Sequence, residues 1–498
     1  MMSNNSRLAV RAGASLLLAL GVCAVVIACG SGGGGGSTNN SNSTGSTVAQ
    51  QLAACTAKLP ALAVPTTGNS VPVIVDAGPC VYGVQPGAAA GTAASVFILG
   101  SANVPYTSVT ICNPGTTTCQ TIDHILVDTG SVGLRVMSSL LNASISLPAQ
   151  AASGGSGALL ECVQFADGYS WGSVRKADVH LAGEQALNIP VQVIGDSSAY
   201  TVPSACSSSA TTAFNDPISF GANGVLGVGL FAQDCGTGCV GSANAGNGFY
   251  YLCASTSSCT GYGPLVTEQV PNPVISFTDY QGVLLQMPAL PSGTVAEATM
   301  YGTLIFGINT QSNNLTTLTN PNVYYASNYF QKSGCGFSAG NFNSALVSTT
   351  GAYNLDTANY CNSFIDSGSN GIFMPNDGTP TPIPTDTTAN GSWFLPTNPS
   401  TTITVTATQQ GIDPSTGNPS GSPNTFSFPI INAETVLFPS NGGNDSVFLG
   451  LGAPSGSTIG GIDWGLPFFF GRSVYVGIEG ESATIGSAGY VTGPYWAF

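Results

Sequence analysis

The sequence repeats one short pattern in its two halves, and this repeat constrains the fold more than any other feature. Residues 125–131 read ILVDTGS and residues 363–369 read SFIDSGS, so Asp128 and Asp366 are 238 residues apart (residue 366 against residue 128). In each copy an apolar, strand-like run ends at an acid that is followed at once by a turn. One D-[ST]-G-[ST] match is weak evidence, but two matches that both follow apolar residues indicate a duplicated unit.

A second pair of segments supports the duplication. Residues 223–229 read NGVLGVG and residues 463–465 read DWG. Gly227 and Gly465 each follow the aspartate of their own half by 99 residues (227 against 128, 465 against 366). Equal spacing in both halves is what two related lobes predict.

The two aspartates suit one kind of chemistry. A carboxyl group at the end of a buried strand is desolvated, which raises its pKa, and two such groups side by side share one proton. Aspartic proteases are the known example of such a pair, in which one carboxylate takes a proton from water while the other protonates the scissile carbonyl. Asp128 and Asp366 are therefore the candidate catalytic residues. Backbone N–H groups and hydroxyls beside them should orient the acids, and these supporting residues are Thr129, Gly130, Ser131, Ser367, Gly368 and Ser369.

These segments resemble the pepsin-like aspartic peptidase family, and the resemblance covers most of residues 71–498. It implies a mainly-β, bilobal, pepsin-like double β-barrel with the active-site cleft between the lobes. It implies catalysis by Asp128 and Asp366 with no cofactor and no metal. It also implies a flap hairpin that closes over substrate and contains Phe165, Asp167, Gly168 and Tyr169.

The chain departs from the family pattern at several positions. Phe165 stands where the flap usually carries tyrosine, with Tyr169 as a substitute from the other side of the turn. Arg135 occupies a position usually held by tryptophan, and Asp463 opens the second apolar-apolar-Gly segment although it is not apolar. The separation of the two aspartates is longer than usual, which implies insertions such as residues 236–263.

The N-terminus is typical of an exported lipoprotein. In residues 1–28, Arg7 and Arg11 precede a small, apolar run that is too short for a membrane span. The run ends at Cys29 in a sequence typical of a bacterial lipobox, and the alternative is ordinary signal cleavage beside an incidental cysteine. Residues 29–50, rich in glycine, serine, asparagine and threonine, are expected to form a flexible tether. We expect export and a lipid anchor on Cys29, in the outer membrane.

The cysteine count agrees with export. Of 14 cysteines, twelve remain after the signal and lipid cysteines are set aside, and an even number in an exported chain predicts disulfides. Cys112 and Cys119 flank a Pro-Gly turn and are expected to pair. Cys235 and Cys239 would alternatively form half of a metal site, but no second Cys/His pair stands at ligand spacing.

Composition excludes several other functions. Only 6% of residues are charged, with eight Lys+Arg against 23 Asp+Glu and a net charge of −15, so no basic patch exists for nucleic acid. His124 and His180 are the two histidines, which excludes most histidine-dependent mechanisms. Residues 168–172 match the serine-hydrolase pattern GxSxG, but only His180 follows them, so we interpret this segment as a hairpin turn.

Short runs rich in valine and isoleucine predict a mainly-β protein with strands at residues 71–75, 95–99, 124–127, 189–194, 303–308 and 446–449. The best helix candidate is residues 133–142, and residues 236–263 and 375–398 are expected to be surface loops. We divide the folded chain into an N-terminal lobe with an extension, residues 51–305, and a C-terminal lobe, residues 306–498.

The sequence thus predicts a monomeric aspartic endopeptidase that hydrolyses exported polypeptides lying extended across the cleft, and that touches a membrane only through its lipid. One alternative is a catalytically inert pepsin-like surface lipoprotein that binds polypeptide or glycan. A second is a structural or adhesive β-rich surface protein in which both motifs are coincidental. The most informative observation is the separation of the Asp128 and Asp366 carboxyl groups, because acids too far apart to share a proton would count against catalysis.

Overall fold

The computed structural model describes residues 47–498 except 87, 166–167, 208–211, 242–247, 317–322, 327–341, 351–352, 354–358, 377–380, 387–392, 398–400, 414–417, 438–444 and 456–460. The predicted signal peptide, Cys29 and most of the predicted tether therefore lie outside the described residues. The tether was expected to end at residue 50, but helix α1, Val48–Thr56, already begins at Val48. None of the helices in the described part of the chain has the length and apolar character needed to cross a membrane.

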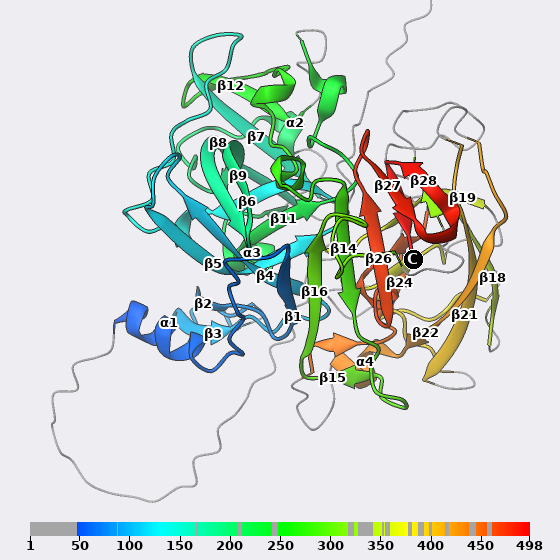
Figure 1. Cartoon of the computed structure of the whole chain (residues 1–498). Coiled ribbons are helices and arrows are strands. Elements are labelled where there is room, and N and C mark those ends of the chain that lie inside the picture. Colours follow the sequence, from blue (N-terminus) through cyan, green and yellow to red (C-terminus); the bar gives the residue numbers. More distant parts are fainter. Residues whose placement is uncertain are drawn as a thin grey trace, which may run out of the picture.

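Strands dominate both halves of the chain (Figure 1). Those of the first half are β1 Ser70–Val75, β2 Cys80–Gly83, β3 Ser95–Ile98, β4 Pro105–Cys112, β5 Cys119–Asp128, β6 Val132–Met137, β7 Ala158–Gln164, β8 Gly168–Leu181, β9 Glu184–Ile194, β10 Thr212–Ala213, β11 Gly224–Val228, β12 Tyr250–Ser255, β13 Ser258–Gly261, β14 Gly282–Met287, β15 Ala296–Glu297 and β16 Met300–Phe306. Those of the second half are β17 Val323–Tyr325, β18 Phe342–Thr349, β19 Asn359–Ile365, β20 Ile372–Met374, β21 Thr402–Gln410, β22 Asn424–Ile431, β23 Val447–Phe448, β24 Gly452–Pro454, β25 Asp463–Trp464, β26 Arg472–Gly477, β27 Ser482–Ile485, β28 Gly489–Thr492 and β29 Tyr495–Ala497. The other short α-helices are α2 Ser204–Ser207, α3 Pro217–Phe220 and α4 Ala433–Leu437.

The first half of the chain forms a closed barrel. Six strands pair in the circular order β4, β5, β11, β6, β9 and β8, and β8 pairs with β4 to close the ring. Within it, β11 lies between β5, to which it is parallel, and β6, to which it is antiparallel. Apolar side chains of these strands fill the interior, as shown by the fully buried Val127, Leu134 and Leu226.

The second half repeats this local arrangement. Its seven-stranded sheet has the order β22-β21-β18-β19-β25-β20-β24, as far as the structure describes it. Strand β25 lies between β19, to which it is parallel, and β20, to which it is antiparallel. Each aspartate loop is therefore followed by a strand that returns beside it, as the equal 99-residue spacings predicted.

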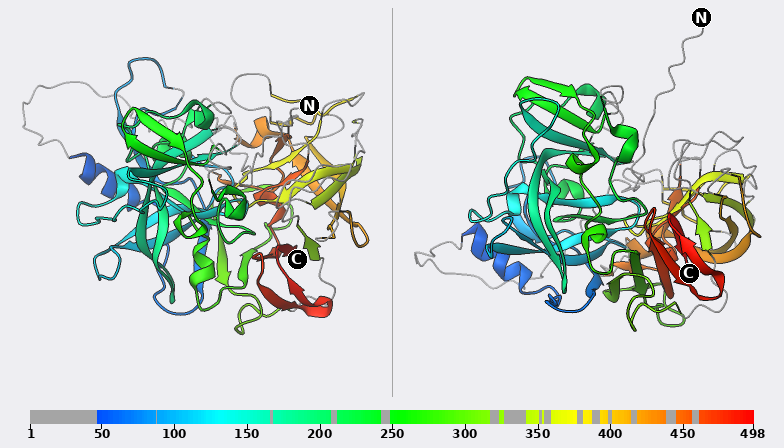
Figure 2. Two further views of the ribbon diagram at one scale, coloured as in Figure 1. Left: turned by 90° about the horizontal axis from the view of Figure 1, so that it is seen from above. Right: turned by 45° about the horizontal axis from the view of Figure 1, so that its top comes forward.

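A shared sheet joins the two halves. Strand β1 pairs with β16, β16 with β14, β14 with β26 and β26 with β29. In Figures 1 and 2 the two halves lie side by side, with β14, β16 and β26 where they meet. The prediction of a mainly-β fold with two similar lobes is confirmed. The lobe boundary at residues 305/306 stays a prediction.

Three local predictions were wrong. Residues 133–142 form no α-helix, because β6 pairs with β11 on one side and β9 on the other, and only the short 3₁₀ turn η1, Ser138–Leu140, follows. Residues 236–263 are not a plain loop, since they contain the paired strands β12 and β13. Residues 168–172 are the start of β8 and not a turn. The six predicted strands are present, and residues 375–398 contain no named helix or strand within their described part.

Among the described residues, five disulfides join ten of the twelve cysteines that were expected to pair. Cys112–Cys119, which joins neighbouring ends of β4 and β5, is confirmed. Cys235 bonds to Cys239 instead of forming half of a metal site. The other pairs are Cys55–Cys80, Cys162–Cys206 and Cys253–Cys259. Cys335 lies outside the described residues, and no group of three potential metal ligands occurs among the residues that the structure describes.

Candidate active site

The two aspartates end equivalent strands. Asp128 is the last residue of β5 and lies opposite Gly227 of β11. Asp366 follows β19, and its backbone N–H donates to the carbonyl of Trp464 in β25 at 3.1 Å. Both aspartates are fully buried, with 0% of each residue exposed. The apolar strands therefore carry both acids into the interior, where the lobes meet.

The two aspartate loops lie in direct contact. A methyl group added to Gly130 would lie 2.4 Å from Cγ of Asp366, and one added to Gly368 would lie 2.7 Å from Oδ1 of Asp128. Both glycines are needed because any side chain there would collide with the opposite carboxyl group. Each glycine therefore lies against the carboxyl group of the opposite lobe, and two buried carboxyl groups brought this close are expected to share one proton. The pKa of Asp366 is well above its usual range, first because of burial and then because of the nearby charges of Asp128 and Asp463.

Each carboxyl group has the same two donors from its own loop. The N–H groups of Gly130 and Gly368 donate to Oδ1 of Asp128 and Asp366 at 2.7 and 2.8 Å. The hydroxyls of the two serines lie against the Oδ2 atoms, Ser131 at 2.5 Å from Asp128 and Ser369 at 3.0 Å from Asp366. Each acid is thus oriented by one backbone and one side-chain group.

The remaining two supporting residues tie the lobes together. The N–H of Thr129 donates to Oγ of Ser367 at 3.1 Å, and the N–H of Ser367 donates to Oγ1 of Thr129 at 2.9 Å. Each hydroxyl then donates to a carbonyl of the opposite strand, Ser367 to Val127 at 2.7 Å and Thr129 to Ile365 at 3.3 Å. Reciprocal buried hydrogen bonds hold the two loops in register. All eight residues expected at the site from the two motifs are therefore brought together.

The predicted flap is a hairpin of β7 and β8. At its end the N–H of Phe165 donates to the carbonyl of Gly168 at 2.8 Å. Asp167, which was also assigned to the flap, lies outside the described residues. The hairpin is present, and its closure over a substrate stays a prediction.

Two aromatic side chains of this hairpin pack into different clusters. The ring of Phe165 is 5.8 Å from that of Phe214 and 5.6 Å from that of Phe220. Tyr169 is buried with Trp171 in a second cluster. The two rings therefore do not occupy one position, so Tyr169 does not simply replace a tyrosine at position 165.

A buried ion cluster lies at the base of the hairpin. Nη2 of Arg135 in β6 is 2.6 Å from Oε1 of Glu161 in β7 and 3.0 Å from Oδ2 of Asp234. The hydroxyl of Tyr250 donates to Asp234 at 2.8 Å. Burial and the charge of Glu161 raise the pKa of Asp234, whereas Arg135 lowers it. The sequence marked Arg135 as unusual but gave no sign of its partners, which come from distant strands.

A third acid reaches the site from β25. Asp463 is fully buried, and its Oδ2 lies 2.6 Å from the hydroxyl of Ser369. Burial raises its pKa well above the usual range. The sequence showed this residue only as a polar departure from an apolar segment.

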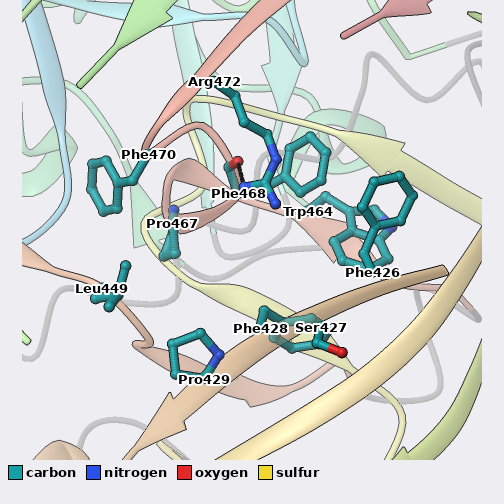
Figure 3. A pocket seen from close by; sticks show the side chains of 10 residues that line it. All are labelled: Phe426, Ser427, Phe428, Pro429, Leu449, Trp464, Pro467, Phe468, Phe470 and Arg472. Atoms are coloured by element: carbon teal, nitrogen blue, oxygen red, sulfur yellow. Dashed lines mark hydrogen bonds between the residues drawn. The ribbon is translucent and has the colours of Figure 1, made fainter. Parts of the chain in front are cut away.

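Trp464, which follows Asp463 in β25, lines a pocket of about 180 Å³ (Figure 3). The pocket is mostly aromatic and apolar, and its lining residues are Phe426, Ser427, Phe428, Pro429, Leu449, Trp464, Pro467, Phe468, Phe470 and Arg472. The guanidinium carbon of Arg472 is 4.5 Å from the ring centre of Phe468. Neither catalytic candidate lines this pocket, so it is separate from the two-aspartate site.

Comparison with known families identifies the chain. The family model described as "Protein of unknown function (DUF3443)" matches residues 89–498. The chain belongs to this family. The match contains both aspartate loops and β25 of this DUF3443 protein, whereas α1, β1 and β2 precede it.

Other comparisons add less to the DUF3443 assignment. A search of curated proteins gave no match. Among solved structures, the aspartic proteinase from Irpex lacteus is similar, with 14% sequence identity and a TM-score of 0.44. The alignment covers 86% of this chain and 96% of that chain.

Proposed function

We propose that this protein is an aspartic endopeptidase that cleaves peptide bonds with a water molecule activated by Asp128 and Asp366. One observation carries the proposal: two fully buried carboxyl groups from separate halves of the chain lie in adjoining loops, each against the glycine of the other loop. Structural carboxylates are normally paired with cations or kept apart, because burying two acids together is costly. A pair that shares one proton instead provides a base and an acid in the same place.

The proposed reaction uses both members of the pair. The ionised carboxylate takes a proton from water, whose oxygen forms a bond to the scissile carbonyl carbon, while the neutral carboxyl protonates the carbonyl oxygen. In the second step the carboxyl group that took the proton from water gives it to the leaving nitrogen as the C–N bond breaks. One hydroxyl of the tetrahedral diol gives its proton to the other carboxylate, so the pair returns to its one-proton state. The N–H groups of Gly130 and Gly368 and the hydroxyls of Ser131 and Ser369 keep both carboxyl groups in place during these steps.

The substrate class and location belong to the same proposal. An extended polypeptide lying across a cleft between the lobes would present its carbonyl to both aspartates at once, and no cofactor is needed. The lipid anchor on Cys29 would hold a monomeric enzyme at the outer membrane and limit its substrates to exported polypeptides. Replacing Cys29 with alanine should move the protein from the detergent phase into the soluble exported fraction, and unchanged partitioning would contradict the anchor.

One observation favours a second candidate. Both aspartates are 0% exposed in this structure, so water and substrate reach them only after part of the protein moves. A catalytically inert pepsin-like lipoprotein that binds polypeptide or glycan would need no such movement. The inert protein keeps the same fold, so only turnover separates the two.

The test is cleavage of an unfolded, alkylated protein between pH 3 and 7, with new N-termini identified by mass spectrometry. The wild type should cleave on the acid side, and Asp128→Asn and Asp366→Asn should each remove cleavage. Asp196→Asn, which changes a carboxylate paired with Arg175 away from the site, is the matched control and should remain active. A mimic with a tetrahedral hydroxyl carbon should bind the wild type and bind both site variants weakly. Cleavage that survives both substitutions would end the proposal.

A further inference from the structure

The residue behind each aspartate loop differs between the lobes. In the N-terminal lobe, Val225 of β11 pairs with Leu126 of β5. In the C-terminal lobe, Asp463 of β25 pairs with Phe364 of β19, and both members of this pair stand 238 residues after their counterparts (463 against 225, 364 against 126). The same place in the backbone pairing thus holds a valine in one lobe and a fully buried acid in the other.

Ser369 joins this acid to the catalytic pair. Its Oγ is 2.6 Å from Oδ2 of Asp463 and 3.0 Å from Oδ2 of Asp366. A serine hydroxyl has one hydrogen, so it cannot donate to both carboxyl groups. For both contacts to be hydrogen bonds, one of the two acids must itself carry a proton and donate it to Ser369.

The surroundings assign that proton to Asp463. Its Oδ1 is buried and has no hydrogen-bond partner among the described residues, and no described cation forms an ion pair with it. An ionised carboxylate in that place would keep a single donor, which is far more costly than a neutral acid. Burial also raises the pKa of Asp463 well above its usual range. The hydrogen bond with Ser369 lowers this pKa and the nearby charge of Asp128 raises it, so the effect of burial prevails.

Within the described part of the chain, the only titratable groups that act on Asp463 are the two catalytic candidates. The acids that face Asp463 are Asp128, from the loop after β5, and Asp366, from the loop after β19. Its partners in the neighbouring strands are Phe364 of β19 and Phe373 of β20, which do not titrate.

We propose that Asp463 is a positioning residue that stays protonated while the site works, donates to Ser369, and so keeps the Ser369 hydroxyl directed at Asp366. The working site then contains three carboxyl groups and two protons, one on Asp463 and one shared by Asp128 and Asp366. When Asp463 loses its proton at higher pH, the hydroxyl turns to Asp463, and Asp366 loses a donor and gains a negative neighbour. This inference rests on the proposed peptidase function. It assigns the alkaline limit of the peptidase activity to the deprotonation of Asp463.

Two substitutions at one position test it through kcat/KM against pH. Asp463→Asn keeps a donor toward Ser369 but cannot ionise, so activity near pH 4 should stay within about threefold of wild type, because no hydrogen bond to Ser369 is lost. Its alkaline limb should move upward by about one pH unit or more. Asp463→Val copies the residue of the other lobe and lacks the donor, so activity near pH 4 should fall about tenfold, the worth of one hydrogen bond. Asp196→Asn is the matched control, since it also removes a carboxyl group but lies away from the site, and it should leave the alkaline limb in place.

A second readout does not depend on turnover. A protonated carboxyl group has its own C=O infrared band, so the difference spectrum between wild type and Asp463→Asn near pH 6 should show the loss of one such band. The same loss should occur in Asp463→Val, which serves if Asp463→Asn does not fold. If the wild type cleaves nothing but the band is lost, the peptidase proposal fails and the protonation of Asp463 stands. An alkaline limb unmoved in Asp463→Asn, or no band lost in either variant, overturns the inference about Asp463.

Discussion

The two lobes present their aspartates on nearly the same backbone but place different side chains behind them. In the N-terminal lobe, Val225 of the returning strand pairs with Arg135 of β6. In the C-terminal lobe the equivalent pair is Asp463 with Phe373 of β20. One lobe therefore has a buried cation where the other has a phenylalanine, and a valine where the other has an acid.

This difference shows which parts of the site are constrained by duplication. The glycines, the serine hydroxyls and the reciprocal bonds between Thr129 and Ser367 are the same in both loops because they act on backbone and carboxyl groups that both lobes share. The residues behind the two loops differ, because Val225 and Arg135 of one lobe correspond to Asp463 and Phe373 of the other. The two catalytic candidates are thus equivalent in orientation but not in electrostatic surroundings, and the following experiments test each half of that statement.

The largest expected effect tests whether Asp128 and Asp366 contribute equally to catalysis. Asp128→Asn and Asp366→Asn should each reduce kcat/KM by at least about 10³-fold, and the double variant should be little worse, because the two carboxyl groups act as one unit. The measurement is single-turnover cleavage of a defined peptide at acid pH, with circular dichroism as the check on folding. Multiplicative losses in the double variant would show that the two acids act independently.

The next effect tests the cation of the N-terminal lobe. Arg135→Met leaves Glu161 and Asp234 buried without their cation, so the free energy of unfolding at pH 7 should fall by about 3–5 kcal/mol. The loss should be smaller at pH 4, where the two acids can take up protons. Arg175→Met removes a partly exposed ion pair with Asp196 and should cost about 0–1 kcal/mol, which makes it the matched control. Urea unfolding at both pH values measures this, and equal losses for the two variants would refute the role of the cluster.

A pH-dependent effect should also be confined to the N-terminal lobe, because both histidines of the chain lie before residue 181. Burial by itself lowers the pKa of His124, but hydrogen bonds to Asp123 and Asp76 outweigh it and raise the pKa to about 9. Because this pKa is raised in the folded protein, the charged His124 stabilises the fold. The stabilisation is complete below about pH 6.5, the pKa of an unfolded histidine, and is lost as the pH rises through 9.

The free energy of unfolding that depends on His124 should fall by up to about 3 kcal/mol between pH 6.5 and 9. Unfolding of wild type and His124→Gln across this range isolates it, since the variant lacks the titrating group. Parallel stability curves for the two proteins would contradict the assignment to His124.

The smallest expected effect concerns the reciprocal hydrogen bonds between Thr129 and Ser367. Thr129→Ala and Ser367→Ala each remove one hydroxyl that accepts an N–H and donates to a carbonyl across the lobes, so each should cost about 1–2 kcal/mol of unfolding free energy. Thr129→Ser keeps the hydroxyl and is the control. A difference between the two alanine variants of more than about 1 kcal/mol would show that the reciprocal bonds are not equivalent.

Local pattern was a good guide wherever one run of residues decided the outcome. The two motifs predicted the paired aspartate loops, and the apolar runs predicted six strands that the structure contains. The Pro-Gly turn predicted the Cys112–Cys119 disulfide. Residues 133–142 were wrongly expected to be helical, because pairing with β11 and β9 outweighs the preference of a short segment. The hairpin of β12 and β13 was missed because glycine- and serine-rich residues dominate its surroundings.

The sequence by itself determined that this protein has two related β lobes, each ending a strand on an aspartate, because strand periodicity and the D-[ST]-G-[ST] turn are local properties. Only the tertiary structure decided what surrounds those aspartates. Ser369 and Asp463 are 94 residues apart, and Arg135 and Asp234 are 99 apart. Contacts over such distances depend on how strands pair and which side chains the packed core excludes from water. The charge and protonation of the site are consequences of that burial, which no single stretch of the chain contains.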